Sequence, residues 1–364
     1  MPLLLIMKLF KCTNCSHPVY FENTYCVRCN ASLGFVAETL QPVALTVENN
    51  ARWSVTENSK KLFYKYCSNH QYGVCNWVIA AESKSSFCKA CELNRTIPDL
   101  SKPEFVDRWR QIENAKHRLV YQLLRMKLPL INKLQSEQTG LVFDFMADET
   151  TDDKERILTG HDNGVITINI AEADDIEREM ARKQMDEVYR TLLGHFRHEI
   201  GHYYWDRLID NTDKLEGFRK VFGDDKIDYA EALKKYYNEG TPLNWNQNYI
   251  SAYATMHPWE DWAETWAHYL HIIDTLETAY SFGMSVHPLV AETKRLHAEM
   301  TKDPYDIEDF EAIMELWFPL TFAMNSLNRS MGLRDIYPFV ITSAVKNKMK
   351  FIHEVVRLAS VKAQ

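Results

Sequence analysis

The sequence has no cysteine after Cys91, although the chain runs to 364 residues. All eight cysteines therefore lie in its first quarter. A secreted protein held together by disulfide bonds would tend to spread its cysteines through the fold, so this clustering argues against that class of protein. It favours metal binding in a reducing compartment, and we expect the protein to be cytoplasmic.

The sequence also lacks a long apolar run, a positive net charge and a recognisable signal peptide. No apolar run reaches the roughly 18 residues that a membrane span needs. The formal net charge of -8 gives no electrostatic basis for general binding to nucleic acid or to anionic membranes. The opening MPLLLIMKLF has neither a basic start nor a small-residue cleavage site. We therefore expect neither membrane nor nucleic acid as a partner, and the sequence indicates no oligomeric state.

The composition is that of an ordinary globular protein. Hydrophobic residues make up 46% of the chain and charged residues 25%. The 12% of aromatic residues argues against disorder, because there is enough apolar material for a core. A chain of 364 residues has room for one large domain and a small one, or for two to three domains.

The cysteines form two groups of four. The first group consists of Cys12, Cys15, Cys26 and Cys29. Its two CxxC pairs lie within KCTNCSHPVYFENTYCVRCN, and each pair can turn back so that two thiolates face one tetrahedral zinc ion. This spacing predicts a zinc ribbon, and it disfavours the alternative of disulfides or unpaired thiols.

The second group consists of Cys67, Cys75, Cys88 and Cys91. It has one CxxC pair and one wider pair. Together the two groups supply eight thiolates, which is the number that two four-cysteine zinc sites need. His17 or His70 could replace a thiolate, although the spacing requires neither. We predict a β-rich zinc-ribbon module over residues 1–97, with two structural zinc ions that supply folding energy.

TIPDLSKP, residues 96–103, is a break between the cysteine-rich part and the first long helical stretch. Apolar residues then recur at helical spacing over 103–136. Residues 141–147, 156–160 and 165–173 have the pattern of strands. The last two of these are joined by Asn163 and Gly164, and Asn-Gly is a strong hairpin signal.

After Asp174 the pattern is helical almost to the end of the chain, starting with a helix over 175–209. The sequence therefore predicts an α+β fold. We expect a mostly helical domain with a short β-sheet over 98–364, preceded by the small β-rich module.

The stretch GHFRHEIGHYYWD carries an HExxH string within the predicted helix. His198 and His202 are four residues apart, so both imidazoles lie on one helix face and can reach one zinc ion. Glu199 lies about 100° round the helix, near the position of a water on that metal. Gly201 costs about 1 kcal/mol against Ala in a helix interior, so we expect another segment to approach closely there. His195 is expected to pack or to support the ligands.

The alternative to a metal site is a chance match, because the chain contains 13 histidines. A catalytic zinc needs a third protein ligand, and the stretch from Ser251 to Ala279 is the obvious source. Pro258 suits the first turn of a helix there. Further along this helix, one stripe carries Glu260, Glu264, His268 and His271.

We predict Glu260 as the third ligand of the zinc ion. Glu264 and His268 are then expected to support the ligands, with Glu264 accepting a hydrogen bond that fixes an imidazole. His257, Asp261 and Glu264 remain open as alternative third ligands. A buried polar network without any metal remains open as well.

These motifs together resemble a known group of enzymes. HEIGH followed by a downstream ExxAE helix is similar to the gluzincin group of zinc peptidases, in which the third ligand is a glutamate. Nearly the whole chain resembles the bacterial zinc-binding metallopeptidase family that carries an N-terminal zinc ribbon. The likeness includes the CxxC pairs, FRKVFGD and NSLNRSMGLRDIYPF. It implies a zincin-like peptidase domain with one catalytic Zn²⁺, and a peptide or protein substrate.

The segment from Glu260 to Glu264 also resembles the ExxAE segment of the anthrax lethal factor peptidase domain. This second resemblance implies that Tyr253, seven residues before Glu260, assists the developing oxyanion.

The predicted function is therefore zinc-dependent peptide hydrolysis, with Glu199 as general base and acid. We expect residues 165–170 to pair with an extended peptide by β-addition. In the segment 325–339, Arg329 could bind a substrate carboxylate. The alternative for this segment is a hydrogen-bonded junction between helices, to which Asn325, Asn328, Asp335 and Tyr337 would belong.

Three other functions remain open on the sequence alone. The first is a zinc-ribbon module that binds protein or nucleic acid, attached to a degenerate peptidase domain. The second is a zinc amidohydrolase that acts on a non-peptide amide. The third is zinc with a purely structural role.

The zinc content of the purified protein tests these assignments. We expect three equivalents in the intact protein and two in His198→Ala, because one ligand of the catalytic ion is lost while both ribbon centres remain. Elemental analysis of desalted protein measures this ratio. Two equivalents in the intact protein would contradict the catalytic site.

Overall fold

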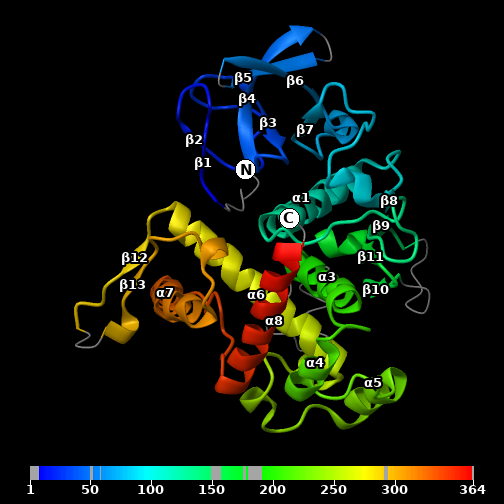
Figure 1. The fold of residues 1–364 in the computed structure, drawn as a ribbon, viewed down its shortest axis with the longest axis vertical. Coiled ribbons are helices and arrows are strands. Elements are labelled where there is room, and N and C mark those ends of the chain that lie inside the picture. Colours follow the sequence, from blue (N-terminus) through cyan, green and yellow to red (C-terminus); the bar gives the residue numbers. More distant parts are fainter. Residues whose placement is uncertain are drawn as a thin grey trace. The chain divides into compact units, whose positions relative to one another are not determined.

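The computed structural model describes residues 8–49, 52–57, 59–148, 157–174, 178, 191–290 and 294–362. The chain forms two compact units. The first comprises Met1–Arg125 and Leu130–Phe196, and the second comprises Met126–Pro129 and Arg197–Gln364. The predicted α+β class is confirmed, with strands concentrated in the N-terminal part of the chain (Figure 1). This division into units differs from the predicted module boundary at residue 97, which stays a prediction.

A closed β-barrel forms the N-terminal part of the first unit. Its strands are β3 (Ser32–Val36), β4 (Gln41–Asn49), β5 (Arg52–Glu57), β6 (Lys60–Tyr66) and β7 (Trp77–Ala80). Successive strands pair antiparallel, and β3 closes the barrel by pairing parallel with β7. Val36, Leu45 and Val78 are buried in its core. A short hairpin of β1 (Phe10–Lys11) and β2 (Pro18–Val19) precedes the barrel.

The helix α1 (Pro103–Arg125) follows the last cysteines. It buries Trp109, Ile112 and Leu119, as the helical spacing predicts. The prediction that it continues to residue 136 is wrong. Lys127 takes a left-handed backbone conformation, with φ of 53°, which an α-helix does not accommodate.

A four-stranded sheet completes the first unit. In spatial order its strands are β10 (Gly160–Asp162), β11 (Val165–Asn169), β9 (Val142–Met146) and β8 (Asn94–Thr96). The predicted hairpin is confirmed: Asn163 and Gly164 join β10 to β11 with φ of 45° and 77°. Two predicted bounds are wrong, because β10 begins at Gly160 and not at 156, and β11 ends at Asn169. There the Asn169 side chain accepts a hydrogen bond from the Ala171 backbone and starts a 3-10 turn, η4 (Ile170–Ala173).

The expected β-addition at residues 165–170 is also wrong. β11 lies inside the sheet, paired with β9 along its length and with β10 from Val165 to Thr167. A strand whose two sides are already paired has no row of free backbone groups to offer a peptide.

The second unit is mostly helical. Its helices are α3 (Leu192–Leu208, continuing from the first unit), α4 (Leu215–Phe222), α5 (Tyr229–Glu239), α6 (Pro258–Ser281), α7 (Phe310–Ser330) and α8 (Ser343–Lys362). A small hairpin of β12 (Ser285–Val286) and β13 (Ala298–Glu299) lies beside α7. Figure 1 shows α6 running alongside α8. Of the predicted helix 175–209, residues 175–177 and 179–190 lie outside the described residues.

The start of α6 agrees with its sequence. Pro258 occupies the first turn, where its missing N–H is not needed, and Glu260 and Asp261 face the positive end of the helix dipole. His257 is the N-cap: its Nδ1 accepts a hydrogen bond from the Trp259 backbone at 3.0 Å. Among the described residues, no helix is long and apolar enough to cross a membrane.

The hairpin at Gly164 can be tested by substitution. We expect Gly164→Ala to lower the free energy of unfolding of the first unit by more than about 1 kcal/mol. A Cβ there would lie 2.2 Å from the Gly140 carbonyl oxygen, at a φ of +77°. Gly160→Ala is the matched control, because its Cβ would meet nothing within 4 Å. Urea unfolding of both variants decides the point, and equal stability would count against it.

Candidate metal centres

Two helices of the second unit bring three ligand-type atoms together. His198 and His202 lie one turn apart on α3, with their Nε2 atoms 3.1 Å from each other. Glu260, in the first turn of α6, places Oε2 3.0 Å from His198 Nε2 and 3.4 Å from His202 Nε2. These three residues form one of the groups whose geometry could hold a metal ion.

The spacing of these atoms fits a zinc ion. Ligands about 2.0–2.1 Å from a tetrahedral zinc lie about 3.3 Å from one another, close to the separations of 3.0, 3.1 and 3.4 Å found here. Glu260 Oε2 is buried and accepts no hydrogen bond from the residues that the structure describes. A buried carboxylate oxygen in that state needs a cation or a donor to offset its desolvation.

The charges of the site also favour a bound cation. Burial by itself lowers the pKa of His198, but the nearby carboxylates of Glu260 and Glu264 raise it well above its usual value. Burial raises the pKa of Glu260, and the neighbouring His202 and His198 more than reverse this, holding it well below the usual value. The centre therefore concentrates carboxylate charge beside two imidazoles, and a dication bound there would offset that charge.

Glu264 orients the first histidine. Its Oε1 lies 2.7 Å from His198 Nδ1, while its Oε2 accepts a hydrogen bond from Ser251 Oγ at 2.6 Å. A carboxylate only accepts, so His198 Nδ1 carries a proton, and Nε2 is the ring nitrogen that faces the centre. This is the arrangement in which histidine ligands of metals are commonly held.

The first cysteine group also converges. Cys12 Sγ lies 3.8 Å from Cys29 Sγ, and Cys15 Sγ lies 3.6 Å from Cys26 Sγ. Four sulfurs around a tetrahedral zinc are about 3.8 Å apart. The second cysteine group is likewise drawn together and fully buried, and all eight cysteines are free of disulfides. His70 is not among the residues of that group, and its Nδ1 lies 2.8 Å from the Cys75 backbone carbonyl.

Comparison with known proteins supports zinc binding by this chain. The family described as "Putative zinc-binding metallo-peptidase" matches residues 105–355, and a zinc-ribbon domain matches residues 9–102. The chain belongs to this zinc-binding metallopeptidase family. Uncharacterized proteins of Mycobacterium bovis and Mycobacterium tuberculosis are each 40% identical over 351 residues, covering 96% of this chain and 95% of theirs. No solved structure matches the chain.

Family membership implies zinc, and the rival third ligands can be compared on geometry. Asp261 is buried, and its Oδ2 is paired with Lys348 Nζ at 2.6 Å. His257 caps α6 and places Nε2 2.9 Å from the Ile227 carbonyl. Glu264 contacts the outer nitrogen of His198. Of the candidates, Glu260 alone places an oxygen next to both Nε2 atoms.

The expected close approach at Gly201 is confirmed. A Cβ at this position would lie 3.1 Å from Ala263 Cα and 3.2 Å from the Trp266 ring, both on α6. Trp262 on the same helix donates a hydrogen bond from Nε1 to the Gly201 carbonyl at 2.9 Å. The absent side chain therefore lets α6 lie directly against the helix that carries the histidines.

Three further side chains surround the centre. Tyr253, in η6 (Tyr253–Thr255), has its ring centroid 6.3 Å from that of His198. Burial and the charge of Glu260 raise the pKa of Tyr253, so its hydroxyl keeps its proton. Tyr229 donates a hydrogen bond to Glu260 Oε1 at 2.7 Å, and the Trp259 ring lies 3.7 Å from that of His202.

Tyr229 and Trp259 were not indicated by the sequence. Trp259 could have been found from the sequence, because it directly precedes Glu260. Tyr229 belongs to α5 and has no motif around it, so only the tertiary contact reveals it.

Other predicted residues lie apart from the three ligand-type atoms. His268 Nδ1 is 2.9 Å from the Tyr337 hydroxyl, and burial lowers its pKa to about 4. His271 Nδ1 lies 2.5 Å from Arg197 Nη1. The residues of the predicted stripe on α6 therefore have different surroundings. Glu260 and Glu264 contact His198 on α3, whereas His268 and His271 contact Tyr337 and Arg197.

The segment around Arg329 forms a junction after α7. Arg329 contacts Asp335 through Nε and Nη2, both at 2.6 Å, and Asn325 pairs with the backbone of Tyr337. These contacts have the geometry of the helix-junction alternative. The role of Arg329 in substrate binding stays a prediction that the described contacts do not support.

His195, in the first unit, does not belong to the group of three ligand-type atoms. Its Nδ1 lies 3.2 Å from Glu172 Oε2.

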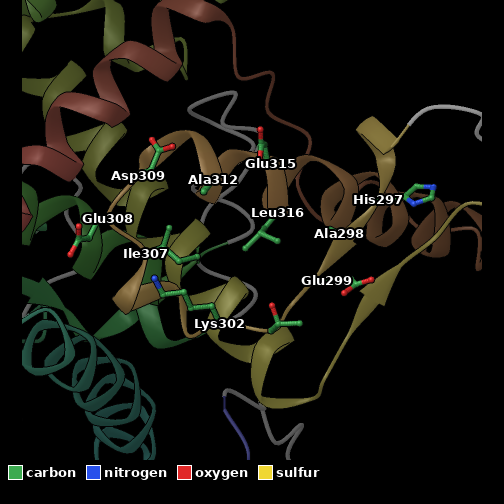
Figure 2. A pocket seen from close by; sticks show the side chains of 11 residues that line it. His297, Ala298, Glu299, Lys302, Ile307, Glu308, Asp309, Ala312, Glu315 and Leu316 are labelled. Carbon is green, nitrogen blue, oxygen red and sulfur yellow. The ribbon is translucent and has the colours of Figure 1, made fainter.

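A pocket of about 490 Å³ lies elsewhere in the second unit, between β13 and α7 (Figure 2). It is lined by His297, Ala298, Glu299, Thr301, Lys302, Ile307, Glu308, Asp309, Ala312, Glu315 and Leu316. None of the candidate zinc ligands borders it, so it carries no part of the proposed chemistry.

The orienting role of Glu264 is open to a direct test. We expect Glu264→Ala to weaken zinc binding at the His198 centre by about 10–100-fold, because His198 loses the acceptor that fixes its ring. Ser251→Ala is the control, since it keeps the contact between Glu264 and His198. Chelator competition, followed for each zinc equivalent, measures the change. Unaltered affinity in Glu264→Ala would contradict this role.

Proposed function

We propose that the protein hydrolyses peptide bonds with a zinc ion held by His198, His202 and Glu260. The observation that supports this most directly is the meeting of their Nε2 and Oε2 atoms at 3.0–3.4 Å, in a family of zinc-binding metallopeptidases. Three protein ligands leave one position open, which is the pattern of catalytic zinc sites. The two cysteine groups are proposed to hold structural zinc.

A zinc ion bound there would supply Lewis-acid chemistry, acidifying a water and polarising the scissile carbonyl. Glu199 lies between the two histidines in the sequence of α3 and is 8% exposed, so it is shielded yet reachable. In the proposed reaction its carboxylate takes the proton of the attacking water and then delivers it to the leaving amine. General acid–base catalysis of this kind contributes typically 10²–10⁴-fold to the rate.

Tyr253 is proposed to donate a hydrogen bond to the oxyanion that develops on the scissile carbonyl. Its place beside His198 and its retained proton both support this role. Loss of such a donor typically costs about 3–4 kcal/mol in the transition state. Tyr229 is proposed to position the Glu260 carboxylate, because it occupies the oxygen that does not face the imidazoles.

The decisive experiment separates the base from the ligands. Glu199→Gln should keep its full zinc content and lose peptide hydrolysis by at least about 100-fold, because the amide cannot accept the water proton. A mixed peptide library, with cleavage products identified by mass spectrometry, offers many different peptide bonds at once and assumes no cleavage specificity. Glu231→Gln, an exposed position on α5, is the matched control.

Hydrolysis that persists in Glu199→Gln would remove the proposed role of Glu199. If the intact protein cleaves small-molecule amides and no peptide, an amidohydrolase replaces the peptidase as the proposed function. In either case the zinc content of the variant shows whether the ligands were disturbed.

A further inference from the structure

The second cysteine group has a fifth donor close to it, and that donor is a histidine. His117 lies on α1, outside residues 9–102 that match a zinc ribbon. Its Nε2 is 3.3 Å from Cys75 Sγ, 3.7 Å from Cys91 Sγ and 3.9 Å from Cys88 Sγ. The side chain is buried, so these contacts belong to the interior of the first unit.

These distances match those between ligands of one metal ion. A nitrogen at about 2.0–2.1 Å and a sulfur at about 2.3 Å from a tetrahedral zinc lie about 3.5 Å from each other. Cys75 Sγ and Cys88 Sγ are themselves 3.7 Å apart, near the sulfur–sulfur spacing of about 3.8 Å. The His117 nitrogen therefore lies at the distance expected of a ligand that shares one zinc ion with Cys75, Cys88 and Cys91.

The other ring nitrogen is held in the manner of a metal ligand. His117 Nδ1 lies 2.6 Å from the backbone carbonyl of Glu113, which can only accept a hydrogen bond. In the neutral ring, Nδ1 therefore carries the proton and the Nε2 lone pair faces the sulfurs. Histidine ligands that bind a metal through Nε2 commonly donate from Nδ1 to a carbonyl in this way.

The nearby carboxylate of Glu113 is already used. Its Oε1 accepts hydrogen bonds from Trp109 Nε1 at 3.0 Å and from Asn94 Nδ2 at 2.6 Å, and Lys116 Nζ lies 2.9 Å from its Oε2. Glu113 and Lys116 form a buried ion pair beside the centre. Glu113 Oε2 also lies 3.9 Å from Cys91 Sγ, so the carboxylate contacts one sulfur, whereas the imidazole lies close to three.

We propose that His117 is a ligand of the second zinc centre, together with Cys75, Cys88 and Cys91. Zinc takes four ligands, so this assignment makes Cys67 a neighbouring thiol, although its Sγ lies within 4.8 Å of the other three sulfurs and accepts a hydrogen bond from the Cys88 backbone. This replaces the predicted four-cysteine arrangement of that centre. It also gives the metal a role the cysteines alone do not imply: the ion fastens α1, which lies in the peptidase match, to the ribbon.

The proposal is independent of the peptidase centre, whose ligand atoms include no sulfur. Cadmium substitution of the full-length protein provides the test, because each centre gives its own ¹¹³Cd NMR resonance and replacing a thiolate by an imidazole moves that resonance to lower shift. We expect one resonance at a four-sulfur position, one at a three-sulfur, one-nitrogen position, and one far lower. Two four-sulfur resonances in the intact protein would overturn the proposal.

Variants then identify the nitrogen. Cys67→Ser should leave the three-sulfur resonance in place, and His117→Ala should abolish it or move it to the four-sulfur position as Cys67 takes over. His70→Ala is the matched control and should change nothing. The resonance of the first cysteine centre reports folding in each sample. A three-sulfur, one-nitrogen resonance that survives in His117→Ala would refute the assignment.

Discussion

The contact between α3 and α6 at Gly201 is the constraint on which the candidate active site depends. Glu260 and the two histidines are far apart in the sequence, and no local interaction can bring them together. The helices meet closely because position 201 has no side chain, which leaves room for Ala263 and the Trp266 ring. The hydrogen bond from Trp262 to the Gly201 carbonyl fixes the register. With that register, the first turn of α6 places Glu260 Oε2 against both Nε2 atoms.

Crowding of buried ligand-type side chains is the second common feature of the centres. At the HExxH centre, two carboxylates lie within hydrogen-bonding distance of His198, and both are largely removed from water. At the second cysteine centre, four buried thiols and an imidazole crowd into one small volume. Burying such groups without a cation is costly, so metal binding and folding are expected to be coupled in both places. Next to His117, the buried charges of Glu113 and Lys116 need no metal ion, because they compensate each other.

Much of the architecture follows from short-range signals in the sequence. The Asn163–Gly164 turn, the start of α6 at Pro258 and the clearance at Gly201 each depend on one residue and its immediate neighbours, and the structure agrees with all three. The errors lie where local and distant effects compete. α1 stops at Arg125 because the backbone turns at Lys127, and β11 has no free edge because β9 pairs with it from a distant part of the chain.

The sequence by itself determined the chemistry available to this protein: two cysteine groups, an HExxH helix and an acidic helix downstream. It determined these because ligand type and helical period are local properties. Tertiary structure alone decided which residues meet. Of the four candidates it placed Glu260 against both Nε2 atoms, and it put Tyr229 beside Glu260, His268 beside Tyr337 and His117 beside the thiols. Those choices depend on how helices distant in the chain pack, and spacing along the sequence carries no information about that.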